Sequence, residues 1–114
     1  MVHKNADMAH IIRENIRGGR GKAHTDMVFG PEDMHGKATL FNRMTLEPGT
    51  SIGEHPHEQD AEIYYVLKGS VTVYDCGTPH KLEEGDAMFT CCGESHSLVN
   101  DSGDTAVILA IVIA

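Results

Sequence analysis

The sequence predicts an all-β protein built as a sandwich or closed barrel. From residue 21 onward, short segments rich in β-branched, aromatic, leucine and methionine residues alternate with turn-forming residues. The turn signals are GPEDMHG at 30–36, EPGTSIG at 47–53, Gly69, CGTP at 76–79, EEGD at 83–86, CCGES at 91–95 and NDSGD at 100–104. About seven or eight strands at this spacing are typical of sandwiches and barrels.

The expected strands follow from these turns. They are Lys22–Phe29, Ala38–Leu46, Glu62–Leu67, Ser70–Tyr74, His80–Leu82, Asp86–Thr90, His96–Val99 and Thr105–Ile113. Before them, Met8, Ile11, Ile12 and Ile16 recur at roughly helical spacing, which predicts a short helix or an arm over Asp7–Arg17 that ends at Gly18. We therefore expect an N-terminal arm over residues 1–21 and one barrel domain over residues 22–114.

Composition narrows the classes of function. A net charge of -8 makes nucleic acid an improbable partner, and we expect the basic group Arg13, Arg17, Arg20 and Lys22 to be solvated surface. The longest apolar run, 106–114, is too short for a membrane-spanning helix, and the first residues lack the apolar core of a signal peptide. Three cysteines do not make a disulfide framework, so we expect a cytoplasmic protein.

Four residues have the pattern of a metal site. His55 and His57 are two residues apart, so in an extended chain both rings point to one face. Glu62 opens the next strand, where a hairpin can bring its carboxylate beside them, and His96 starts a later strand directly after a turn. Imidazole and carboxylate donors suit divalent manganese, iron, cobalt, nickel or zinc.

The same residues match both motifs of the cupin superfamily, which the chain therefore resembles. The spacing of the first motif is matched by Gly49, His55, His57, Glu62 and Gly69. The spacing of the second motif is matched by Gly85, Cys91, Gly93, His96 and Asn100. Only Cys91 departs, because the family usually has proline there. The resemblance implies a jelly-roll barrel (a double-stranded β-helix) with a metal held by His55, His57, Glu62 and His96.

A narrower resemblance, to small bacterial oxalate-decarboxylase-like cupins, rests on the stretch Arg17-Gly18-Gly19-Arg20-Gly21-Lys22 followed by the compact barrel.

Beyond the metal donors, Tyr64 shares strand parity with Glu62 and is a candidate proton or hydrogen-bond donor, although an inward tyrosine is more often core packing. Arg43 is a weaker candidate for clamping a carboxylate, because surface exposure is the simpler expectation.

Two functions remain open on the sequence. The first is a metalloenzyme of dioxygenase, decarboxylase or isomerase type, acting on a small carboxylate or sugar-like molecule. The second is a module that binds or senses a small molecule in the same pocket without reaction. A metal held by neutral imidazoles and one carboxylate keeps a positive charge, so we expect an anionic ligand. The C-terminal strand, apolar on both faces, predicts a homodimer.

Overall fold

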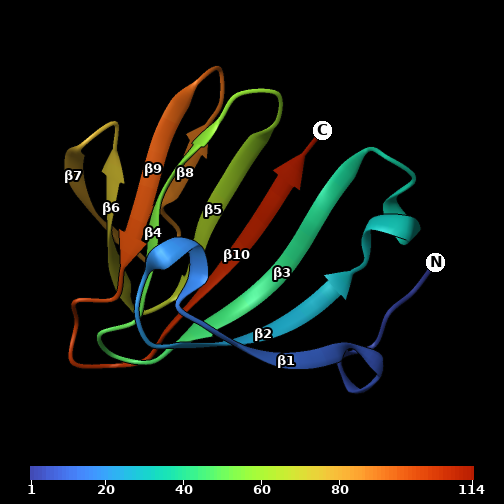
Figure 1. The fold of residues 1–114 in the computed structure, drawn as a ribbon. Helices are drawn as coiled ribbons and strands as arrows, with labels where there is room; N and C mark the ends of the chain where they lie inside the picture. The colour runs from blue at the N-terminus through green and yellow to red at the C-terminus, as the bar shows by residue number, and fades with distance from the viewer.

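The structure, a computed structural model, describes residues 1–114 and is built almost entirely from strands (Figure 1). The strands are β1 (Ala9–Glu14), β2 (Lys22–Phe29), β3 (Ala38–Leu46), β4 (Ser51–His57), β5 (Ala61–Lys68), β6 (Ser70–Asp75), β7 (Thr78–Glu83), β8 (Ala87–Thr90), β9 (Glu94–Val99) and β10 (Ala106–Ile113). Three short 3-10 helices complete it: η1 (Asn5–Asp7), η2 (Ile16–Gly18) and η3 (Pro31–Met34). No helix has the length and apolar character needed to cross a membrane.

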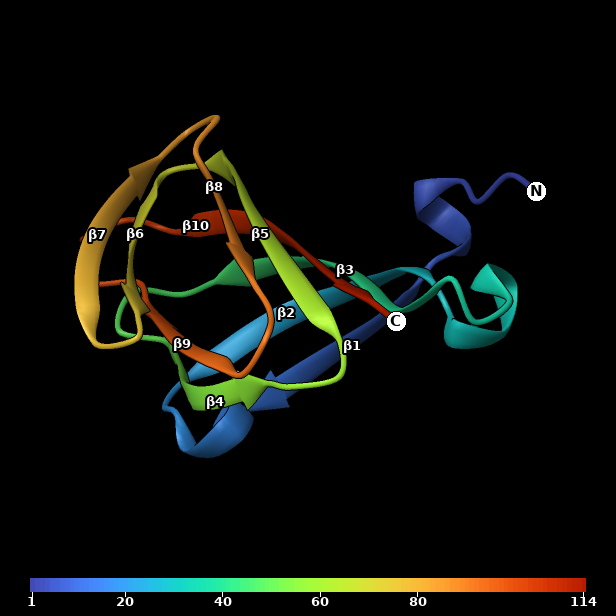
Figure 2. The same ribbon diagram turned by 90° about the horizontal axis from the view of Figure 1, so that it is seen from above.

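The strands form two antiparallel sheets that face each other (Figure 2). The larger sheet has the order β1-β2-β3-β10-β5-β8, and the smaller one has the order β4-β9-β6-β7. Strands distant in sequence are therefore neighbours, as β10 lies between β3 and β5. This arrangement confirms the predicted all-β jelly-roll barrel.

The core lies between the two sheets and follows the two-residue period of the strands. Along β10, Ala106, Ile108, Ala110 and Val112 are buried, and the residues between them are only partly covered. The inward side chains of the other strands complete one apolar cluster. On β4, β5 and β9 the same alternation turns polar side chains inward as well, and these are the predicted metal donors.

Strand β4 was not among the expected strands, because Gly53 and Pro56 interrupt its sequence. The structure shows why both residues are tolerated. β4 is an edge strand, where a missing N–H at Pro56 breaks no ladder between two neighbours. A register shift between Ile52 and His55 accommodates the glycine.

Of the two alternatives predicted for Asp7–Arg17, a short helix or an arm, the helix is wrong. Residues Ala9–Glu14 form β1, which pairs with β2 along its length, and only the single turn of η2 follows. An isolated helix of this length is marginal in water, whereas the β-branched pair Ile11 and Ile12 suits a strand. The chain entry thus becomes the edge of the larger sheet, while the division into an arm and a barrel at residue 21 stays a prediction.

A polar cluster on the outer face ties this entry to the barrel. The Arg43 guanidinium donates to Asp26 on β2 at 2.9 Å and to Asn5 in η1 at 2.5 Å, and His10 on β1 also hydrogen-bonds Asp26. Arg43 therefore points away from the interior, in agreement with the surface position expected from the sequence. Burial alone would raise the pKa of Asp26, but the hydrogen bonds from His10 and Arg43 hold that pKa below its ordinary value.

We expect Asp26→Asn to destabilise the fold at neutral pH and to lose this effect in acid. Since the pKa of Asp26 is lower in the folded than in the unfolded protein, its charge stabilises the fold above about pH 4, and protonation removes this stabilisation as the pH falls toward the folded-state pKa. Urea unfolding of both proteins between pH 7 and pH 3 measures the difference. A free-energy difference independent of pH would contradict the role of the charge.

Candidate metal centre

The four predicted donors meet at one point inside the barrel. His55 and His57 come from β4, His96 from the neighbouring β9 and Glu62 from β5 in the opposite sheet. One ligand atom from each residue lies within 4.8 Å of the other three. The Glu62 Oε1 atom is 3.0 Å from Nε2 of His57 and 2.9 Å from Nε2 of His96. All four side chains are buried.

The far nitrogen of each ring is fixed by a second hydrogen bond. Nδ1 of His55 donates to the Gly53 carbonyl at 2.8 Å, and Nδ1 of His57 donates to the Asp60 carboxylate at 2.7 Å. Nδ1 of His96 is hydrogen-bonded to the Thr90 hydroxyl at 2.9 Å. A carbonyl and a carboxylate only accept, so the proton of a neutral His55 or His57 ring sits on Nδ1 and Nε2 presents a bare lone pair. Such outer partners are typical of metal-binding histidines.

This arrangement favours a proton or a metal ion at its centre. Nε2 of His55 is 3.1 Å from Nε2 of His96, and both face the Glu62 oxygen. Lone pairs and a carboxylate at these separations repel one another unless a proton or a metal ion lies between them. The donors therefore fit one divalent metal ion, as three imidazole nitrogens and one carboxylate oxygen form a common set for first-row metals.

The ionisation of the site follows from the same contacts. Burial alone would raise the pKa of Glu62, but hydrogen bonds from His55 and His96 lower it to about 2. The hydrogen bond to Glu62 raises the pKa of His55, against the effect of burial. Glu62 is thus a carboxylate at neutral pH, and it is ready to act as an anionic ligand.

Tyr64 lies beside the donors, as its strand parity predicted. Its ring stacks on His96 with centroids 4.7 Å apart and an interplanar angle of 10°. Burial, and then the charge of Glu62, raises the pKa of the Tyr64 hydroxyl well above its ordinary value. Tyr64 therefore keeps its proton and can offer a hydrogen bond, while its ring also packs in the core.

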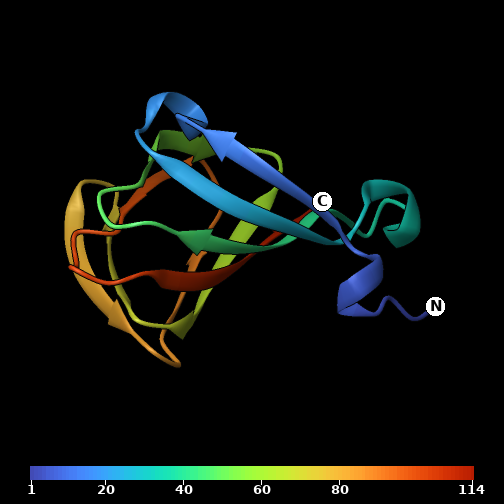
Figure 3. The same ribbon diagram turned by 90° about the horizontal axis from the view of Figure 1, so that it is seen from below.

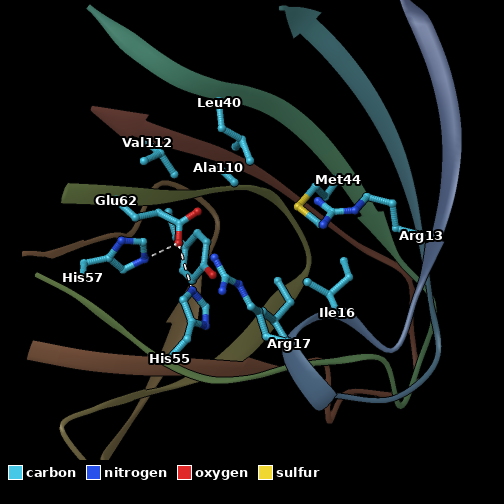
Figure 4. Close-up of a pocket in the computed structure, with 12 residues that line it drawn as sticks. Arg13, Ile16, Arg17, Leu40, Met44, His55, His57, Glu62, Ala110 and Val112 are labelled. Atoms are coloured by element: carbon cyan, nitrogen blue, oxygen red, sulfur yellow. Dashed lines mark hydrogen bonds and ion pairs between the residues drawn. The ribbon is translucent and has the colours of Figure 1, made fainter. Parts of the chain in front are cut away.

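A cavity of about 90 Å³ opens beside the donors (Figure 4). Its wall is largely apolar, with Leu40, Met44 and Val112 from the larger sheet. Two cations also line it, Arg13 from β1 and Arg17 from η2. Sequence reasoning assigned both arginines to solvated surface, and Arg17 is indeed exposed whereas Arg13 is half-buried. Their position at the cavity was missed, because the sequence did not place the chain entry against the barrel. Their spacing within one basic cluster was the only signal in the sequence.

The second motif reaches His96 despite its departure at Cys91. In the turn, the Glu94 N–H donates to the Cys91 carbonyl at 3.0 Å, and the Gly93 N–H donates to the His57 carbonyl at 2.9 Å. Cys91 and Cys92 are joined by a disulfide, and Cys76 is free and exposed. A bond between adjacent residues closes almost no chain, so it does not cross-link the fold.

Comparison with known proteins agrees with this geometry. A family model described as a cupin domain matches residues 42–112, and the chain belongs to the cupin family. It is 40% identical over 113 residues to an oxalate-binding protein of Thermotoga maritima, covering 99% of this chain and 93% of that protein.

Solved structures show the same fold. The crystal structure of a predicted oxalate decarboxylase from Thermotoga maritima has a TM-score of 0.93 at 40% identity, covering 99% of this chain and 98% of that one. The polyketide cyclase RemF from Streptomyces resistomycificus has a TM-score of 0.74 at 26% identity, covering 99% and 78%. These relatives support the narrower resemblance to small cupins of the oxalate-decarboxylase-like type.

We expect the purified protein to carry about one equivalent of a first-row metal and His55→Ala to carry almost none, because that change removes one of four donors from a buried site. Elemental analysis after desalting measures the metal. His24→Ala is the matched control. His24 is exposed, and its side chain hydrogen-bonds Glu47 and none of the four donors. Equal metal in both variants would contradict the assigned site.

Proposed function

We propose that the protein binds one divalent transition metal ion, of manganese, iron, cobalt, nickel or zinc, and through it a small carboxylate. The observation that supports this most is the convergence of His55, His57, Glu62 and His96 on one point, where the first three also line a cavity. Four protein donors leave two positions free on a metal that prefers six, enough for a ligand that chelates through two oxygens.

The cavity favours a small anion. At about 90 Å³ it has space for a few water molecules or a compact organic acid, and its apolar wall weakens competition from water. A divalent ion against the single carboxylate of Glu62 leaves net positive charge, which Arg13 and Arg17 increase. The oxalate-binding relative supports oxalate as the first candidate.

Binding without reaction is the function that the residues support best. The histidines and Glu62 are committed as donors, and the two arginines stay charged, so no side chain at the cavity is free to act as a general base. A bound metal would supply Lewis acidity and, for manganese or iron, redox chemistry. The chain itself would hold and orient the ligand.

An enzyme is the second candidate, and Tyr64 favours it. Splitting oxalate into carbon dioxide and formate breaks the carbon–carbon bond and consumes one proton, and the Tyr64 hydroxyl beside Glu62 is a protonated donor at the site. The predicted oxalate decarboxylase among the similar structures supports the same direction.

We expect oxalate to stabilise the metal-loaded protein without being consumed. A ligand present at 100 times its dissociation constant adds about 2.7 kcal/mol, which raises the melting temperature of a domain this size by roughly 10 °C. Thermal unfolding with oxalate, beside an assay for formate and carbon dioxide, separates the candidates. Steady formate production that Tyr64→Phe abolishes would favour the enzyme, and the absence of any shift would overturn both.

We also propose that the protein is a homodimer, joined through the outer face of the larger sheet. Outward side chains of β5, β8 and β10 make this face apolar, and Tyr65, Leu67 and Phe89 are exposed on it by 39%, 42% and 58%. Adjacent exposed apolar side chains of this size are typical of protein interfaces. A second copy would cover the outer face of β10, whose inner face the barrel already buries, in line with the homodimer that the sequence predicts.

Phe89→Glu should therefore shift the protein from twice the monomer mass to the monomer mass, because a charge in an apolar interface is left without a partner. Light scattering at micromolar concentrations measures this mass. Tyr74→Glu serves as the control, since Tyr74 is a similarly exposed aromatic residue of the smaller sheet. A wild-type protein that is monomeric throughout this range would refute the dimer.

A further inference from the structure

The turn between β1 and β2 holds an unusual backbone conformation. Asn15 and Arg17 have φ angles of 52° and 55°, in the left-handed region that residues with a side chain seldom adopt. Two hydrogen bonds close the turn, from Gly18 N–H to the Asn15 carbonyl at 3.2 Å and from Gly19 N–H to the Ile16 carbonyl at 2.9 Å. Surrounding contacts must therefore hold this turn in place.

Those contacts come from β4, the strand that carries two metal donors. Arg20 and Ser51 exchange backbone hydrogen bonds of 3.2 and 2.7 Å, which attach the turn to the start of β4. A Cβ atom on Gly19 would overlap the Ser51 carbonyl, and one on Gly53 would overlap the Arg17 carbonyl. The two backbones thus approach as closely as only glycine permits. Figure 3 shows the turn lying against β4.

The turn directs one residue into the core and the next to the cavity. Ile16 packs against the buried apolar cluster and anchors the turn. Arg17 extends from η2 toward Glu62 and His55 (Figure 4). Arg17 is exposed, and its guanidinium makes no hydrogen bond or ion pair within the chain. A positioned cation without a protein partner therefore stands at the cavity.

We propose that Arg17 is a second anchor for the ligand and that it selects small dianions over monoanions. This inference rests on the proposed binding of a carboxylate to the metal, and it adds which carboxylates are preferred. A ligand such as oxalate that chelates a metal through one pair of oxygens presents its other pair on the opposite side. A guanidinium matches such a pair of carboxylate oxygens with two parallel hydrogen bonds.

Glycolate is the informative comparison ligand. It offers a metal one carboxylate oxygen and one hydroxyl oxygen, as a chelate of similar size, but it has a single negative charge and no second carboxylate for Arg17. The selectivity that Arg17 confers is therefore measured by how much a substitution weakens oxalate relative to glycolate, and not by the affinity for either ligand alone.

The test uses titration calorimetry on the manganese-loaded full chain. We expect Arg17→Gln to weaken oxalate binding about 10- to 100-fold, the effect of losing charge-assisted hydrogen bonds, and glycolate binding less than about 3-fold. Metal content after desalting should match the wild-type protein, because Arg17 is not a metal donor. Arg20→Gln, a neighbouring exposed arginine outside this cavity, should bind both acids as the wild type does.

A second variant tests the positioning of the turn. Gly19→Ala places a Cβ atom against the Ser51 carbonyl and should displace Arg17, so it should reproduce the selective loss of oxalate with the metal retained. Oxalate binding unchanged in Arg17→Gln, or equal losses for the two acids, would overturn the anchor while leaving metal-bound carboxylate intact. A wild-type protein that binds metal but neither acid would overturn the proposed function as well.

Discussion

The constraint on which the structure depends is the burial of three imidazoles and a carboxylate around one point. Buried polar groups need partners, and here the inward-facing atoms of the four side chains are mostly acceptors. A cation satisfies all of them at once. The barrel surrounds the donors with the apolar core, so that a metal ion would be the strongest partner available to them.

The fold supplies the outer contacts from the same segments that carry the donors. Gly53 and Asp60 are two and three residues from the histidines that they orient, so the β4 hairpin largely preorganises its own two ligands. The second motif does the same for its turn. The buried Asn100 side chain donates to the carbonyls of Leu46 and Asp104, and its backbone bonds Gly49 and Thr50. Motif residues that bind no metal thus hold together the turns that end β3 and β9.

The donors were predictable because their signal is local. A two-residue spacing in a strand places His55 and His57 on one face, and the motif spacing leads to Glu62 and His96 without any knowledge of the sheet order. The strand of Ala9–Glu14 and the position of Arg17 at the cavity were not predictable in this way. The strand depends on pairing with β2, and the position of Arg17 depends on the contact of the turn with β4. Neither contact leaves a pattern in the sequence of the segments that make it.

The net negative charge of the chain does not predict the charge of the ligand at the site, because the two act over different distances. Exposed charges farther apart than about 8 Å are screened at physiological ionic strength, so a net charge of -8 spread over the surface acts weakly inside the cavity. The cavity wall itself carries Arg13 and Arg17 beside the buried carboxylate of Glu62. An anion that entered would therefore meet local positive charge, and under the proposed function the geometry of Arg17 and the donors, more than the net charge, would decide which anion binds.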